Sequence, residues 1–354
     1  MPKHQIFLVH GMGQFERGWS ASTAKLLTKV FGAFPVPKAI RLDDAFDFPE
    51  ITYSKVFDKW RSQWKADAAS IAGQLATGGL VSSIADDLGN VATSASGNNF
   101  LQTHVLDVLF WRFIRQMAEE VTLEVLTQID QHLKTFGNEP VEYSVICHSL
   151  GTSVMYESMH AGLTDTKPLL SSRLPDHFVA VANCARLLWG KGGDIYATQM
   201  GPSPFNHKGM CNRFLDFGHA LDPVWQISPF HDPPNSWFPE PALRERTYYH
   251  DVIPTEDIQD PNVHSLAHYL SHPAVHVPLI RSFIGDESAV TPDQYEHALD
   301  AWRADRLGKK ALKDAKQKLN ALGQPQQDDW NAIAATFVKL RQTIAGAKPA
   351  DGEN

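Results

Sequence analysis

Short apolar runs recur along the first three quarters of the chain and predict the strands of a buried sheet. The stronger runs lie at 5–9, 141–147, 177–182, 213–217 and 246–252, and residues 50–54 form a weaker candidate. Runs with few polar interruptions are typical of parallel strands that are covered by helices on both faces.

Apolar residues at helical spacing predict helices between these strands. The strongest pattern spans 101–136, and its apolar positions are Val105, Leu109, Phe113, Met117, Val121, Val125, Ile129 and Leu133. Shorter helical patterns are expected at 154–163, within 264–285 and after Pro292. Strands that alternate with helices predict an α/β fold with a mainly parallel central sheet flanked by helices.

One long segment does not fit this alternation. Residues 59–100 begin with two tryptophans and then become rich in Ala, Ser and Gly, which predicts a helical lid or cap insertion. Its apolar residues recur at near-helical intervals, as in a lid that meets lipid or in a pair of core helices: Ile71, Leu75, Leu80, Val81, Ile84 and Leu88. We therefore expect an α/β domain at 1–290 with this insertion, a helical extension at 291–346 that covers the sheet or mediates assembly, and a flexible tail at 347–354.

Composition narrows the classes of function. The 354 residues are 43% hydrophobic and 20% charged, as in ordinary globular proteins. The net charge of −8 disfavours nucleic acid as the main partner, because phosphate binding needs a basic face. The chain has no run of eighteen apolar residues, so no transmembrane segment is predicted.

The N-terminal sequence and the cysteines bear on location. The first strand is expected to begin near Gln5, which leaves no room for a signal peptide. The three cysteines (Cys147, Cys184 and Cys211) are too few for a disulfide framework. Together these features favour a cytoplasmic location, although export by a route that needs no signal peptide stays open.

Residues 145–151, Val-Ile-Cys-His-Ser-Leu-Gly, carry the most informative chemistry. An apolar run ends at Ser149 and a helix of small residues begins, so the serine is expected on a sharp strand-to-helix turn with its oxygen exposed. The helix start also aims backbone N–H groups at the same place. Ser149 is therefore the candidate nucleophile. The usual pattern is Gly-x-Ser-x-Gly, and here Cys147 replaces the first glycine, where the following helix demands a small residue.

The glycine-rich segment after the first strand is the candidate oxyanion site. His10-Gly11-Met12-Gly13 lets the backbone approach a substrate closely, and the Met12 and Leu150 amides are the two candidate donors. The neighbouring residues are expected to contact substrate: His10, Gly11, Gly13 and His148. The segment matches neither the phosphate-loop nor the dinucleotide-binding pattern of glycines.

Asp222 is the candidate acid, because it directly follows an apolar strand and precedes a proline. Asp216, inside the strand, and Asp251 are its rivals. The loop after Asp222 contains aromatic residues that either form an acyl pocket or pack in the ordinary way: Trp225, Phe230, Trp237 and Phe238. Of these, Trp225 is the candidate substrate contact.

Four histidines spaced by four offer candidates for the base: His264, His268, His272 and His276. Such spacing places side chains along one helical face, where two histidines can share a zinc ion. However, Pro273 and Pro278 are expected to break the helix, and no acidic residue stands between the histidines, so no metal is predicted. His272 and His276 are expected to be solvated, and the residues alone leave the base open between His264 and His268.

These pieces together resemble the α/β-hydrolase superfamily of serine esterases and lipases. The resemblance covers about residues 5–285 and depends on four short motifs in the superfamily's order, at 10–13, 147–151, 222–224 and 264–273. It implies an α/β-hydrolase fold with Ser149 as nucleophile, Asp222 as acid and His264 as base. His264 is preferred because lipase-like relatives place this histidine shortly before a Tyr-Leu pair and a His-Pro or Asp-Pro turn. Here these are residues 269–270 and 272–273.

The resemblance implies hydrolysis of carboxylic esters through a covalent acyl-enzyme, without a metal or an organic cofactor. The expected partner is a small-molecule or lipid ester, with transient contact to a lipid surface. Thioesterase, amidase or acyltransferase chemistry would use the same triad, and a non-catalytic binding protein could use the same scaffold. The sequence does not indicate an oligomeric state.

Overall fold

The structure, a computed structural model, describes most of the α/β region and the first turns of the predicted extension. The described residues are 3–34, 45–63, 111, 114–164, 174–188, 201–202, 209–222, 224–225, 229–230, 238, 241–259 and 263–304. The predicted lid from residue 64 onward, the extension beyond 304 and the tail lie outside these residues.

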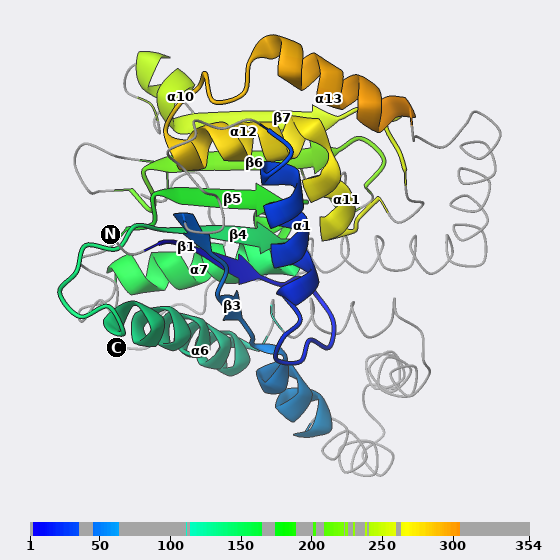
Figure 1. The fold of residues 1–354 in the computed structure, drawn as a ribbon. Helices are drawn as coiled ribbons and strands as arrows, with labels where there is room; N and C mark the ends of the chain where they lie inside the picture. The colour runs from blue at the N-terminus through cyan, green and yellow to red at the C-terminus, as the bar shows by residue number, and fades with distance from the viewer. Residues whose placement is uncertain are drawn as a thin grey trace, which may run out of the picture.

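A seven-stranded sheet forms the centre of the described fold, and its strands run in parallel (Figure 1). The strands are β1 His4–Val9, β2 Phe46–Asp47, β3 Glu50–Ile51, β4 Tyr143–His148, β5 His177–Val181, β6 Arg213–His219 and β7 Tyr248–Ile253. Their order is β2-β1-β4-β5-β6-β7, and β3 also pairs with β1. This arrangement confirms the predicted mainly parallel α/β sheet.

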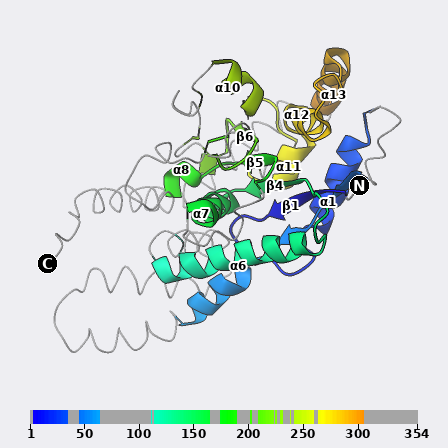
Figure 2. The ribbon, with the colours of Figure 1, turned by 90° about the vertical axis from the view of Figure 1, so that its left-hand side faces the viewer.

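Helices cover both faces of the sheet (Figure 2). One face carries α1 Ala21–Phe31, α11 Leu266–Ser271 and α12 Pro273–Ile284, and the other carries α6 Arg115–Lys134, α7 Leu150–Thr164 and α8 Ala185–Leu188. The remaining described helices with both ends defined are α10 Pro241–Thr247 and α13 Pro292–Ala304. Parallel strands need such helical crossovers, which explains why helices separate the strands in the sequence.

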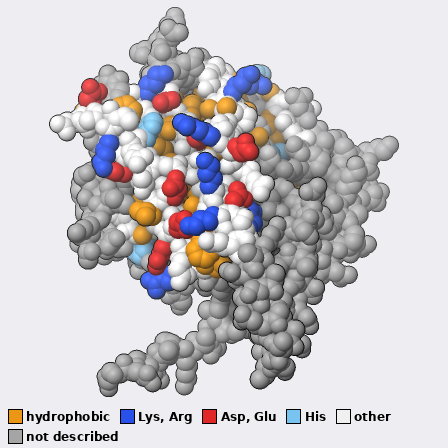
Figure 3. All heavy atoms as spheres, turned by 90° about the horizontal axis from the view of Figure 1, so that it is seen from below, with side chains coloured by type: hydrophobic (Ala, Val, Ile, Leu, Met, Phe, Trp, Pro, Cys, Tyr) orange, Lys and Arg blue, Asp and Glu red, His pale blue; other side chains and the backbone are white. Residues whose placement is uncertain are grey.

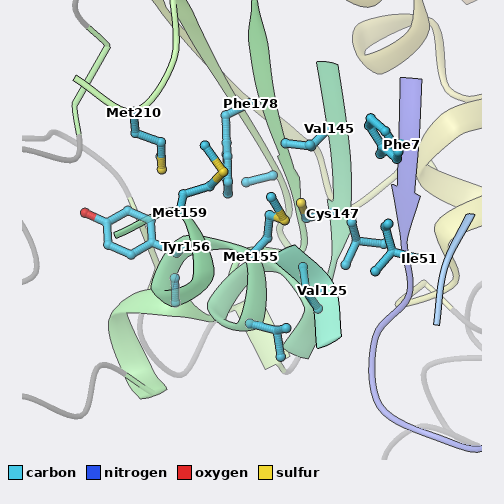
Figure 4. Close-up of a cluster of buried hydrophobic side chains, with 14 of the residues drawn as sticks. Phe7, Ile51, Val125, Val145, Cys147, Met155, Tyr156, Met159, Phe178 and Met210 are labelled. Carbon is cyan, nitrogen blue, oxygen red and sulfur yellow. The ribbon is translucent and has the colours of Figure 1, made fainter. Parts of the chain in front are cut away.

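Two hydrophobic cores form because neighbouring strand residues point to opposite faces. In β4, Val145 and Cys147 pack toward α6 and α7, whereas Ile146 packs toward the other helices. Figure 4 shows Val145, Cys147 and Met155 of α7 in the core on the α6 and α7 face of the sheet. The predicted helical positions of α6 are buried as expected: Met117, Val121, Val125, Ile129 and Leu133. The periodicity of this segment was therefore read correctly where it is described.

The close approach of α7 to β1 explains the small residues around the serine. A Cβ atom on Gly151 would lie 2.2 Å from the backbone oxygen of His10, so a larger residue there would displace a strand end. Cys147 is fully buried and fits where the usual pattern has glycine.

Several expectations about individual elements are corrected. The sequence analysis did not predict α1 or β2, and the strand expected from residue 246 begins at Tyr248 because α10 precedes it. The segment 264–285 forms two helices that meet at Pro273. Pro273 occupies the first turn of α12, where a missing N–H costs nothing, but Pro278 lies inside that helix and does not end it.

The start of the predicted extension packs on the domain. Arg303 of α13 binds the buried carboxylate of Asp257 through Nε and a terminal nitrogen, at 3.0–3.2 Å. The side chain of Gln259 donates to the backbone oxygen of Trp302 at 2.8 Å. These contacts attach α13 to the loop that follows β7, beside the chain segment that leads to His264.

The surface of the described part mixes charges of both signs. On the face shown in Figure 3, basic and acidic side chains alternate and neither sign dominates. Helix α6 contributes ion pairs one turn apart, Arg115 with Glu119 and Lys134 with Asp130. Among the described residues, no helix has both the length and the hydropathy of a membrane span.

Candidate active site

Ser149 occupies the sharp turn between β4 and α7. Its φ of 53° lies in the left-handed region, which only one other described non-glycine residue, Ala182, shares. Such a conformation costs about 1–2 kcal/mol for an L-residue, so the surrounding structure must hold it in place. The Ser149 amide donates to the Val181 oxygen at 3.0 Å, and the Ser149 carbonyl accepts from Thr152. The turn is therefore fixed from both sides.

Three side chains from separate loops meet at the carboxyl edge of the sheet. The Oγ atom of Ser149 lies 2.9 Å from Nε2 of His264, and Nδ1 of His264 lies 2.8 Å from Oδ2 of Asp222. Ser149 follows β4, Asp222 follows β6 and His264 lies between β7 and α11. The structure thus brings together the three residues that the resemblance singled out.

His268, the rival base, lies elsewhere. Its ring centroid is 5.4 Å from that of His219 and 5.9 Å from that of Trp302, on the side where α13 packs. His264 is therefore the histidine from this segment that reaches the serine.

Asp222 is fully buried and receives several hydrogen bonds. His264 and the Tyr269 hydroxyl both donate to Oδ2, and the Val224 amide donates to Oδ1 at 2.9 Å. Burial alone would raise the pKa of Asp222, but the charge of His264 and these hydrogen bonds outweigh it and lower the pKa. The carboxylate is thus kept ionised beside the imidazole.

The rival carboxylates have other partners. Asp216 accepts from Asn183 at 2.9 Å and pairs with His250 at 2.8 Å inside the fold. Asp251 accepts the hydroxyl of Tyr249. Neither therefore takes the position beside His264.

Tyr269 is a site residue for which the sequence analysis predicted no role. It is fully buried in α11, and its hydroxyl lies 2.8 Å from the same Asp222 oxygen that His264 contacts. Burial and the neighbouring Asp222 raise the pKa of Tyr269 well above its usual value, so the hydroxyl stays a donor. The sequence offered only the Tyr-Leu pair at 269–270 as a landmark, without this contact.

Replacing Tyr269 with phenylalanine is expected to lower kcat for the ester hydrolysis that the sequence predicts by roughly 10- to 100-fold. A hydrogen bond to a charged group is worth about 1.5–3 kcal/mol, and its loss raises the pKa of Asp222 and weakens its support of His264. The measurement is kcat between pH 5 and 9. Tyr249→Phe is the matched control, because Tyr249 donates to Asp251 instead. A normal rate and pH profile in Tyr269→Phe would reduce Tyr269 to a packing residue.

The loop after β1 lies directly against the serine. A Cβ atom on Gly11 would fall 2.9 Å from Cβ of Ser149, so this position must be glycine for the two to fit. Gly13 has a φ of 122°, and its carbonyl accepts from Ser54 at 3.2 Å. The loop therefore makes the close approach that its glycines predict.

The two predicted oxyanion donors are available. Leu150 is the first residue of α7, and Met12 lies in the loop beside the serine. Neither amide donates a hydrogen bond within the described part of the chain. An amide at a helix start that lacks an internal partner is a ready donor to an anion.

His10 is built into the loop after β1. Its ring stacks between Tyr53 and Phe15, with centroid separations of 4.0 and 4.4 Å, and Nδ1 lies 2.8 Å from the Gly11 oxygen. Burial lowers the pKa of His10 to about 4, so the ring is neutral near pH 7. These contacts give the side chain a positioning role within the loop, and the predicted contact with substrate stays a prediction.

His148 joins the turn to the base. Its Nε2 donates to the backbone oxygen of His264 at 2.7 Å, so this nitrogen is already occupied. Burial, and then the neighbouring His264, lower the pKa of His148 to about 3. The residue next to Ser149 therefore holds the chain that carries the imidazole, in place of the predicted substrate contact.

The aromatic residues after Asp222 divide between two places. Phe230 and Phe238 are buried in the core beside Phe214 and Tyr248, which supports ordinary packing for both. Trp225 packs against Gly218, where a Cβ atom would come within 2.3 Å of the indole. Trp237 lies outside the described residues.

The burial of Ser149 differs from the expectation. The residue is only 1% exposed, although its oxygen was predicted to be exposed at the strand end. Close neighbours are the His264 ring and the Gly11 backbone, which the isolated strand pattern does not reveal.

The other histidines of the 264–276 segment are buried as well, and the four do not share one helical face. His272 is 1% exposed and caps α12 by accepting from the Ala274 amide, and His276 is 5% exposed and bonds the Leu270 oxygen. The solvated state expected for these two is therefore wrong, because Trp302 of α13 packs against His272 and Phe34 packs against His276.

Comparison with known proteins found no matching family model and no significant similarity to any curated protein or solved structure. The function is therefore inferred from the geometry of the site.

Proposed function

We propose that this protein is a serine hydrolase that cleaves carboxylic esters through a covalent acyl-enzyme. The observation that carries this proposal is the continuous contact from Ser149 Oγ through the His264 ring to Asp222, with steps of 2.9 and 2.8 Å. A serine hydroxyl becomes nucleophilic when a base takes its proton and a carboxylate orients that base.

The surroundings of the triad support the same reaction. The serine lies on a left-handed turn at a strand end, and the order serine, acid, histidine follows β4, β6 and β7. This order and this turn are the features in which the chain resembles the α/β-hydrolases. Within the described residues the amides of Met12 and Leu150 donate no hydrogen bond, and they lie beside the serine turn, as donors to an oxyanion would.

Each proton in the proposed cycle is carried by residues of this chain. Ser149 attacks the ester carbonyl while His264 accepts its proton, and the Met12 and Leu150 amides stabilise the oxyanion. His264 then protonates the leaving alcohol, and the acyl group stays on Ser149. Water, deprotonated by His264, attacks the acyl-enzyme and releases the acid, while Asp222 stabilises the imidazolium in both steps.

A fluorophosphonate probe tests whether the buried serine is reactive. We expect labelling of the wild-type chain at Ser149, confirmed by peptide mass, and no labelling of Ser149→Ala. Ser158→Ala is the matched control, because Ser158 is also buried in α7 and its hydroxyl makes no hydrogen bond within the described residues. A folded wild-type chain that resists the probe, or labelling that survives in Ser149→Ala, would reject the proposal.

The choice of leaving group is resolved by a substrate panel. Ester, thioester and anilide substrates with the same acyl group are compared at equal concentration, followed by a series of acyl lengths for the best class. The proposal expects the ester to have the highest kcat/KM. A higher value for the thioester or anilide would keep the triad and change the assigned substrate.

A further inference from the structure

A second polar cluster lies at the amino-terminal edge of the sheet, opposite the triad. It contains His4 at the start of β1, Glu142 just before β4 and Asp176 just before β5. These strands are adjacent and parallel, so their first residues meet at one edge. One ligand atom from each of the three side chains lies within 4.8 Å of the other two.

Ser144 joins His4 to His177. The Ser144 hydroxyl lies 2.8 Å from Nε2 of His4 and 2.8 Å from Nδ1 of His177. This contact occupies Nε2 of His4, so Nδ1 is the ring nitrogen left to face the neighbouring carboxylates.

The His4 ring is 8% exposed and is held in place by Ser144. When Nε2 donates to the Ser144 hydroxyl, Nδ1 of the neutral ring carries a lone pair.

This lone pair points at negative charge. Nδ1 of His4 lies 3.6 Å from Oε2 of Glu142, and no described residue donates a proton to it. Asp176 is oriented by the Asn212 amide, which donates to Oδ1 at 2.8 Å. Three side chains that can each offer an electron pair therefore converge, and a cation between them would offset their mutual repulsion.

We propose that His4 Nδ1, Glu142 and Asp176 bind a divalent transition-metal ion of the zinc class. Zinc accepts both imidazole nitrogen and carboxylate oxygen as ligands, and three protein ligands leave a fourth position for water. Ser144 and Asn212 orient the ligands from behind, as outer hydrogen bonds do in metal sites. The ion would join the starts of β1, β4 and β5, away from the ester-cleaving site.

The geometry needs only a small adjustment. Ligand atoms of a tetrahedral zinc ion lie about 3.3–3.5 Å apart, given bonds of about 2.0–2.2 Å. The Glu142 side chain is 78% exposed and can rotate toward the buried His4 without disturbing the core.

Titration of the untagged, chelator-treated protein with ZnCl₂ tests the site, by calorimetry and by the visible spectrum of a Co²⁺ substitute. We expect one equivalent to bind and the melting temperature to rise by about 5 °C at a hundredfold excess over Kd. Asp176→Asn and Glu142→Gln should each weaken this binding at least about 100-fold, and Asn212→Ala about 10-fold or more.

Glu139→Gln is the matched control, because Glu139 precedes the same strand and lies outside the cluster. It should bind Zn²⁺ as the wild type does. Zinc binding that Asp176→Asn and Glu142→Gln leave unchanged would overturn the proposal. A wild-type chain that binds no zinc would also overturn it, and would show that a proton on His4 Nδ1 serves the cluster instead.

Discussion

Replacing His264 with asparagine is expected to lower kcat for ester hydrolysis by about 10⁴- to 10⁶-fold. Nε2 of His264 is the group within hydrogen-bond distance of the Ser149 hydroxyl, so its loss leaves no base for the attack. The asparagine side chain cannot accept and return the proton. Initial rates with a short p-nitrophenyl ester measure the effect, and circular dichroism checks the fold.

Two comparisons make this result specific. His268→Asn should keep kcat within a few-fold, because His268 packs near His219 and Trp302. The double variant of Ser149→Ala and His264→Asn should be no slower than either single variant, since members of a triad act as one unit. Equal losses in His264→Asn and His268→Asn would point to a structural effect and contradict the assignment of His264.

Lowering the pH from 7 to 5 is expected to remove most of the free energy of unfolding. Burial lowers the pKa of His10, His148, His272 and His276 to between about 3 and 4, against about 6.5 in the unfolded chain. Protons therefore bind the unfolded state first. The stability from these neutral rings is complete above about pH 6.5 and is lost as the pH falls toward 4.

The magnitude follows from the number of protons. In this pH window, each of these four histidines lowers the free energy of unfolding by up to about 1.4 kcal/mol per pH unit. Together they lower it by on the order of 5 kcal/mol between pH 6 and 5. This is comparable with the whole stability of many domains. Urea unfolding at pH 7.5, 6.5 and 5.5 measures the slope of the unfolding free energy against pH. His276→Gln should reduce this slope by the contribution of about one proton. A stability that does not change between pH 7.5 and 5.5 would contradict the prediction.

Much of the sheet could be predicted, because parallel strands buried on both faces leave apolar runs in the sequence. The runs around Val145 and Phe214 became β4 and β6 with only their ends shifted. Strand β2 has two residues, too few for any pattern. Helix α1 buries only Thr23, Leu27 and Phe31, a narrow stripe that a polar segment does not reveal.

The candidate site was predictable where local turn chemistry decides it, and not where distant segments do. The strand-to-helix turn at Ser149 and the Asp-Pro pair at 222 are local signals. The burial of Ser149 and the hydrogen bond from the Tyr269 hydroxyl to Asp222 both depend on residues more than forty positions away along the chain. Likewise, His272 was expected to contact solvent, but Trp302 of α13 packs against it.

The cysteine in place of the usual glycine has an experimental use. Cys147 lies two residues before Ser149. Cys147, Cys184 and Cys211 are all buried, and burial raises the pKa of each thiol. A thiolate is the species that alkylating reagents attack, so the intact fold shields these sulfurs. Iodoacetamide then modifies the protein only as the fold opens, which makes pulse alkylation a clock for unfolding, while serine-directed reagents report on the native state.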